Sequence, residues 1–132
     1  ISWRGTGNTE NMARTISKEI EEKGGQVDLF KVTAAPKDLS AYEKLAFGCP
    51  SMGDEVLEEG DFQPYFDSVA GALKGKKVAL FGSYGWGDGQ WMRDWAERVQ
   101  ALGGQLFDEG KISQYEGDEV EYQAYGSAFA AW

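Results

Sequence analysis

Histidine is absent from the 132-residue sequence, and cysteine occurs once, at Cys49. A single cysteine cannot form an internal disulfide, so we expect a protein of the reducing cytoplasm. Without histidine, the side chain that most often moves protons near neutral pH is missing. We interpret Cys49, which lies at the end of an apolar stretch, as a packed core residue rather than a nucleophile.

Basic residues are also scarce, because 13 lysines and arginines face 22 acidic residues and give a formal net charge of −9. Nucleic-acid binding needs a basic surface, so the composition argues against it. The acidic surface fits two roles, simple solubility or attraction of basic partner proteins. Apolar runs fall well below the roughly 18 residues of a membrane span, so no membrane partner is expected. No secretory signal pattern precedes the first structural element, although the chain starts at Ile1 rather than Met.

The chain alternates between helical and strand patterns. Apolar residues recur at helical spacing over residues 9–23, 62–73 and 90–102, and a last helix is expected over about 118–132. Strands are predicted at residues 26–32, 44–50, 78–85 and 105–112, and a short helix within 35–43. Alternation of this kind predicts one doubly wound α/β domain over residues 1–132.

Ligands of such folds bind beyond the carboxyl ends of the strands, which makes every strand-to-helix loop a candidate site. The first loop, "RGTGNTE", precedes a helix whose free N–H groups and dipole favour an anion. It lacks the third glycine of a dinucleotide fingerprint and the lysine of a P-loop. A cradle for one terminal phosphate monoester is one interpretation, and an ordinary capping turn is the other.

Two more loops bring large side chains to the same edge. Met52 stands in "SMGDE", and Trp86 stands between glycines in "GSYGWGDGQW". Alone, each side chain fits a packing or surface role. Together with a phosphate loop, they describe a slot for a planar ring with a phosphate tail, a description that FMN fits.

The stretches "GTGNTE", "CPSMGDEVLEE" and "ALFGSYGWGDGQWMRDW" resemble the short-chain flavodoxins, closest to the clostridial type, over nearly the whole chain. The resemblance implies a flavodoxin-like, three-layer α/β/α fold around a five-stranded parallel sheet. It implies that residues 4–9 hold the FMN phosphate and that Met52 and Trp86 sandwich the isoalloxazine. Glu55 would accept a hydrogen bond from flavin N3–H, and Gly53 and Asp54 would form the turn beside N5. The complete predicted cofactor site is Arg4, Gly5, Thr6, Gly7, Asn8, Thr9, Pro50, Ser51, Met52, Gly53, Asp54, Glu55, Ser83, Tyr84, Gly85, Trp86 and Gly87.

The chain departs from the family pattern in three places. Arg4 replaces the usual hydroxyl residue, and its guanidinium either points to solvent or binds the phosphate as a charged fork. The first strand, residues 1–3, is shorter than the family implies by about three or four residues. The last strand and helix match less well, so a flavin contact near Tyr115 is open.

The predicted function is electron transfer by FMN, which cycles between semiquinone and hydroquinone in place of ferredoxin. A flavin without acid–base groups beside it suits a carrier without substrate turnover of its own. Acidic residues around the ring, such as Asp54 and Glu55, disfavour the reduced anion, whereas Glu58, Glu59 and Asp61 fit a solvated rim equally well. Expected partners of this monomer are reductases and low-potential acceptor enzymes with basic docking surfaces. The alternatives are an FMN-dependent reductase and a flavin-binding assembly factor; a phosphorylation-controlled receiver would carry acidic residues where "RGTGNTE" stands.

Overall fold

The computed structural model describes residues 1–2, 8–36, 38–49, 60–84, 89–107, 111–114 and 119–132. The helices are α1 (Asn8–Glu22), α2 (Phe62–Val69), α3 (Gln90–Ala101) and α4 (Glu119–Ala131), with short 3-10 turns η1 (Val32–Ala34) and η2 (Ala70–Ala72). The strands are β1 (Lys44–Gly48), β2 (Lys77–Tyr84), β3 (Gln105–Leu106) and β4 (Lys111–Gln114). Within these described ranges, no helix has the length and apolar character needed to cross a bilayer.

The sheet is parallel, with β2 at its centre. β1 pairs with one edge of β2, and β3 and β4 pair in turn with the other edge. The sequence predicted one strand over residues 105–112, whereas the structure has two short ones. On that edge of β2, Lys77 pairs with Gln105 and Phe81 pairs with Lys111. The segment from 105 to 111 is therefore two residues longer than the segment of β2 from 77 to 81 that it faces. β3 and β4 therefore pair with β2 in different registers.

Two isolated bridges extend the sheet beyond β1. Ser2 pairs in parallel with Gly48 on one side and with Lys31 on the other. The lateral order, from Lys31 through Ser2 and β1 to β2, is that of a doubly wound sheet. Five full strands are not confirmed, because among the described residues only β1, β3 and β4 form ladders, each of them with β2.

Two local predictions were wrong. Residues 26–32 were predicted as a strand, but only Lys31 forms a bridge. The described part of 35–43 holds a turn rather than a short helix. There the Asp38 carboxylate accepts a hydrogen bond from Ser40 N–H at 3.0 Å, and such a local bond competes with helix formation.

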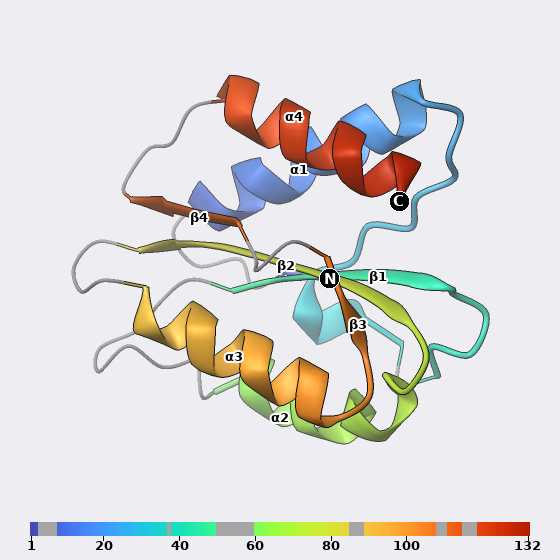
Figure 1. Ribbon diagram of the computed structural model, residues 1–132, viewed down its shortest axis with the longest axis vertical. Helices are drawn as coiled ribbons and strands as arrows, with labels where there is room; N and C mark the ends of the chain where they lie inside the picture. The colour runs from blue at the N-terminus through green and yellow to red at the C-terminus, as the bar shows by residue number, and fades with distance from the viewer. Residues whose placement is uncertain (3–7, 37, 50–59, 85–88, 108–110, 115–118) are drawn as a thin grey trace.

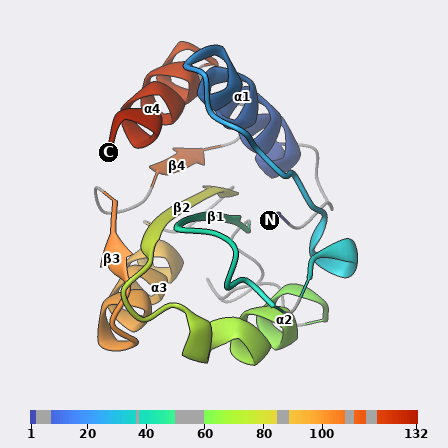
Figure 2. The ribbon, with the colours of Figure 1, turned by 90° about the vertical axis from the view of Figure 1, so that its right-hand side faces the viewer.

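Helices cover both faces of the sheet. α1 and α4 lie on one face, and α2 and α3 lie on the other (Figures 1 and 2). Side chains alternate accordingly along β2: Val78 and Leu80 pack in the core beneath α2 and α3, whereas Ala79 and Phe81 pack beneath α1 and α4. The three-layer α/β/α arrangement predicted from the sequence is therefore present.

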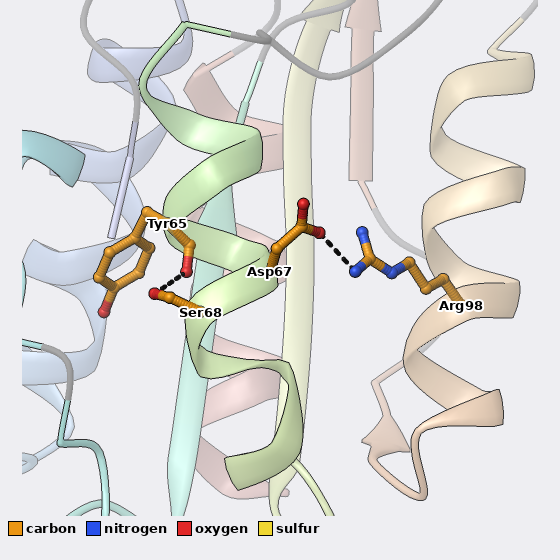
Figure 3. Close-up of polar contacts among 4 residues, drawn as sticks. All are labelled: Tyr65, Asp67, Ser68 and Arg98. Carbon is orange, nitrogen blue, oxygen red and sulfur yellow. Dashed lines mark hydrogen bonds and ion pairs between the residues drawn. The ribbon is translucent and has the colours of Figure 1, made fainter.

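Polar contacts fasten the helices at their exposed rims. Lys44 Nζ donates to the carbonyls of Phe129 and Ala130 at 3.1 Å each, and Lys77 Nζ donates to the Trp132 carbonyl at 2.7 Å. Two lysines from the sheet thus bind the last carbonyls of α4, where a positive charge is favourable. On the opposite face, Arg98 of α3 reaches Asp67 of α2 (Figure 3).

Candidate functional site

The site begins at the place where the chain changes direction across the sheet. Ser2 lies between Lys31 on one side and Gly48 on the other, so the connections that follow Ser2 and Gly48 start from adjacent strand ends. β1, β2 and β4 end at the same side of the sheet, where α1, α3 and α4 also begin (left in Figure 1). This is the topological switch point of a doubly wound sheet, where ligands bind.

Most residues of the predicted site fall outside the described part of the chain. Arg4, Gly5, Thr6 and Gly7 do so in the first connection, residues 50–55 in the second, and Gly85, Trp86 and Gly87 in the third. Tyr115, Glu58 and Glu59 are likewise outside it. Four predicted residues are described, at the positions that flank these connections: Asn8, Thr9, Ser83 and Tyr84.

The first of these positions is the start of α1. The helix begins at Asn8, and Thr9 in its first turn is 1% exposed. The only acidic residue of the first turn, Glu10, pairs with Arg14 at 2.8 Å. Because Arg14 offsets the Glu10 carboxylate, the amino end of this 15-residue helix remains favourable for an anion such as a phosphate. The described start of α1 is therefore compatible in charge with a phosphate, whereas residues 4–7 of the predicted cradle lie outside the described chain.

The second feature of this edge is a close-packed group of residues around Cys49, between the ends of β1 and β2, which we call the Cys49 floor. Cys49 N–H donates to the Phe81 carbonyl at 3.1 Å, and Trp91 Nε1–H donates to the Cys49 carbonyl at 3.3 Å. Gly82 allows this closeness, because a Cβ at that position would lie 2.1 Å from the Cys49 carbonyl oxygen. Cys49 is fully buried, which confirms its interpretation as a packed residue.

Three supporting residues were missed by the sequence reasoning: Gly48, Gly82 and Trp91. A Cβ on Gly48 would meet the Phe81 ring at 2.1 Å, so both glycines allow a close approach between neighbours. A glycine inside a strand pattern marks such an approach, and this signal was available in the sequence. Trp91 was assigned only to an amphipathic helix, and its bond to Cys49 could not be read from spacing.

The described residues at this edge supply a place where a ligand can bind. They contain no cluster of three or more side chains placed to hold a metal ion. The sequence contains no histidine anywhere. What the edge offers is a helix amino terminus beside a close-packed floor, an arrangement suited to holding an anionic cofactor that brings its own chemistry.

Comparison with known protein families agrees with the doubly wound α/β fold described above. The family model described as Flavodoxin matches residues 3–132. The flavodoxin of Clostridium beijerinckii is 48% identical over 122 residues, covering 92% of this chain and 88% of the relative. The flavodoxin of Megasphaera elsdenii is 37% identical over 131 residues, covering 98% of this chain and 96% of the relative.

Solved structures agree with the sequence relatives. The solution structure of two-electron reduced Megasphaera elsdenii flavodoxin superposes with a TM-score of 0.89 at 37% identity. The match covers 99% of this chain and 96% of that structure. The match therefore extends over nearly the whole chain.

Proposed function

Because the chain belongs to the flavodoxin family, we propose that it carries electrons one at a time between partner proteins, on FMN bound at the carboxyl edge of its sheet. FMN is the cofactor of this family, and the switch point is its established place in the fold. The observation that carries the proposal is the position of Ser2, between Lys31 and Gly48, because the segment that leads to α1 and the segment that follows Gly48 then start from neighbouring positions at one edge of the sheet. When bound, FMN supplies the redox chemistry, and the protein positions it and sets its potential.

Each connection has a proposed part in binding. Residues 4–9 hold the phosphate in front of α1, and residues 50–55 with 83–87 enclose the ring. Met52 and Trp86 pack on its two faces, where an aromatic side chain and a thioether give large contact areas. Glu55 accepts from N3–H, and Gly53 with Asp54 forms the turn beside N5.

The proposed carrier is a monomer of the cytoplasm that works between the one-electron and two-electron reduced states of FMN, at low potential. The net charge of −9 fits reductases and acceptor enzymes that dock through basic surfaces. A carrier of this kind has no substrate turnover of its own.

The test is a redox titration of the protein reconstituted with FMN. Apoprotein should bind FMN tightly, give a yellow complex and turn blue when one electron is added. A second, well-separated step should follow at lower potential. Failure to bind FMN would overturn the proposal. Rapid NADH-dependent quinone reduction by the purified protein would indicate an FMN-dependent reductase instead.

Trp86→Ala tests the stacking role. We expect FMN binding to weaken by about 1 to 3 kcal/mol, because aromatic contact with the ring is lost. Trp132→Ala is the matched control, since Trp132 packs at the opposite end of the sheet, with the Lys77 amine 5.3 Å from its ring. Fluorescence quenching titrations of FMN measure both variants. Equal affinities in Trp86→Ala and the unchanged protein would remove Trp86 from the site.

A further inference from the structure

Trp91 and Trp95, one turn apart in α3, are buried to the same degree but differ in hydrogen bonding. Each residue is 2% exposed. The Trp91 Nε1–H donates to the Cys49 carbonyl at 3.3 Å. Within the part of the chain that the structure describes, the Trp95 Nε1–H has no hydrogen-bond partner, and its ring packs edge-on with Phe62 and Phe66. Burial in this layer therefore does not by itself require a bonded indole, and the bond of Trp91 calls for a reason of its own.

The bond of Trp91 joins two stretches of chain that flank the proposed ring site. Cys49 directly precedes residues 50–55, and Trp91 follows residues 83–87. The two bonded residues are 42 positions apart, so no local structure requires their contact. Both connections are proposed to enclose the FMN ring, and any role of Trp91 toward the ring rests on that proposed function.

Each end of this contact is fixed by backbone hydrogen bonds. On the helix side, Gly89 has a φ of 88°, which favours glycine, and its carbonyl accepts from Arg93 N–H at 3.2 Å. On the strand side, Cys49 N–H donates to the Phe81 carbonyl at 3.1 Å. Trp91 therefore connects the start of a helix to the end of a strand ladder.

The Cys49 carbonyl sets the direction in which the chain continues after β1. The bond made by Cys49 N–H leaves rotation about the Cα–C bond free, and this rotation turns the carbonyl. Gly82 makes room for the carbonyl, because a Cβ there would lie 2.1 Å from its oxygen. The carbonyl shares a planar peptide group with the nitrogen of Pro50, whose ring restricts the next backbone angle. A carbonyl held by the Trp91 N–H therefore passes its orientation to the chain beyond it.

Flavin N5 is the atom for which a displacement of this segment matters most. Gly53 and Asp54 are proposed to form the turn beside it. N5 gains a hydrogen when FMN takes one electron from a partner protein and a proton from solvent. A hydrogen bond from this N–H depends steeply on distance and angle, whereas packing on the ring faces is spread over many weak contacts. Displacing the segment should therefore weaken binding of one-electron reduced FMN more than binding of oxidised FMN.

We propose that Trp91 is a positioning residue for the redox cofactor. Its indole N–H holds the Cys49 carbonyl in the orientation from which the following segment reaches flavin N5. Trp91 acts through Cys49 and does not itself touch FMN. It therefore favours the one-electron reduced state over the oxidised state.

Trp91→Phe tests this role in the protein reconstituted with FMN, and Trp95→Phe is the matched control. Both replace a buried indole of α3 by a smaller ring, but only Trp91→Phe removes the bond to Cys49. In Trp91→Phe, the affinity for one-electron reduced FMN relative to oxidised FMN should fall by about threefold to tenfold, the size expected for one hydrogen bond. The first midpoint potential of a redox titration measures this ratio. In Trp95→Phe the ratio should stay within about twofold of the unchanged protein.

Two further readouts separate the lost bond from the lost volume. Benzothienylalanine in place of Trp91 keeps the size of the ring and has sulfur where the indole has N–H. It should lower the ratio as Trp91→Phe does, and an unchanged ratio would contradict the proposal. The second midpoint potential should correspond to a change of less than about twofold in every variant, because N5 keeps its hydrogen in both states of that step.

Equal ratios in Trp91→Phe and Trp95→Phe would overturn the proposal. A Trp91→Phe protein that binds FMN more weakly but keeps both midpoint potentials would overturn it as well, since a residue that only supports the fold has this effect. Failure of the unchanged protein to bind FMN would remove the proposed function and this role of Trp91 with it. When the unchanged protein binds FMN and shows two reduction steps, a missing effect of Trp91→Phe counts against Trp91 alone.

Discussion

Because Gly82 has no side chain, Cys49 can lie close to β2 at the edge of the sheet where FMN is proposed to bind. A Cβ there would lie 2.1 Å from the Cys49 carbonyl oxygen and 3.2 Å from the Trp91 ring. Neither neighbour can move freely, because Cys49 is bonded to both Phe81 and Trp91. Cys49, which directly follows β1, is held in place by these contacts.

Gly82→Ala should therefore lower the free energy of unfolding by about 1 to 3 kcal/mol, as expected when an added group overfills a packed core. FMN affinity should fall as well, because Cys49 must shift. Gly71→Ala is the matched control: a Cβ on Gly71 meets nothing within 4 Å. Its effect should stay within about 0.5 kcal/mol. Urea unfolding compares the two variants, and a Gly82→Ala protein as stable as Gly71→Ala would show that the floor is not tight.

At the scale of elements, α2 and α3 are joined by Arg98. Its guanidinium pairs with Asp67 at 2.5 Å (Figure 3). The same guanidinium lies 5.0 Å from the Phe66 ring centroid. The Arg98 and Asp67 side chains are 39% and 50% exposed, so solvent screens the ion pair. The packing of the guanidinium over Phe66 is less affected by solvent.

Removing the charge and removing the packing should have different costs. Asp67→Asn should change the free energy of unfolding by less than about 1 kcal/mol. Arg98→Ala should cost more, because contact with Phe66 is also lost. Chemical unfolding at low and high salt separates the contributions: salt should reduce the effect of Asp67→Asn and leave most of the effect of Arg98→Ala. Equal costs for the two variants would contradict the role of Phe66.

The packing of α4 on α1 depends on a glycine. A Cβ on Gly126 would lie 3.0 Å from both Cα and the carbonyl oxygen of Ile16, a buried residue of α1. Gly126→Val should force the helices apart and cost about 1 to 3 kcal/mol. Ala128→Val is the control, since Ala128 lies on the exposed side of the same helix and should lose only helix propensity, about 0.5 kcal/mol. Thermal unfolding ranks the variants, and similar losses would mean that the crossing is not close.

For the whole molecule, the Tyr65 hydroxyl links stability to pH. Burial raises its pKa to about 12 in the folded chain, against 10.0 for an exposed tyrosine. Above pH 10 the unfolded chain loses this proton first, so the contribution of this group to the free energy of unfolding should be lost as the pH rises from 10 toward 12. Below pH 10 both states keep the proton and this contribution is constant.

Tyr65→Phe provides the comparison. It removes the titrating hydroxyl, together with the hydrogen bond that this hydroxyl donates to the Pro36 carbonyl, and leaves every carboxylate and lysine in place. The urea midpoint of the unchanged protein should fall more steeply than that of Tyr65→Phe between pH 10 and 12. Parallel pH profiles would show that the Tyr65 hydroxyl is hydrated in the folded protein.

Local patterns in the sequence determined the class of fold. The helical spacing over residues 9–23 and 90–102 predicted α1 and α3 nearly to their ends, because one apolar stripe on each helix must face the sheet. The continuous apolar stretch of residues 78–85 predicted β2, because a strand covered on both faces has no polar side. The loops of the cofactor site could be proposed from glycines, Met52 and Trp86, while their geometry lies outside the described residues.

Only the tertiary structure decided which segments became strands and what supports the site. Residues 26–32 have a strand sequence, yet most remain unpaired, because a strand needs hydrogen bonds from a neighbour and propensity cannot supply them. The bond from Trp91 to the Cys49 carbonyl, and the closeness that Gly82 permits, join residues far apart in the chain. Spacing along a sequence records the face on which a side chain lies. Which residue that side chain contacts depends on how the helices pack on the sheet, and this packing exists only in the folded chain.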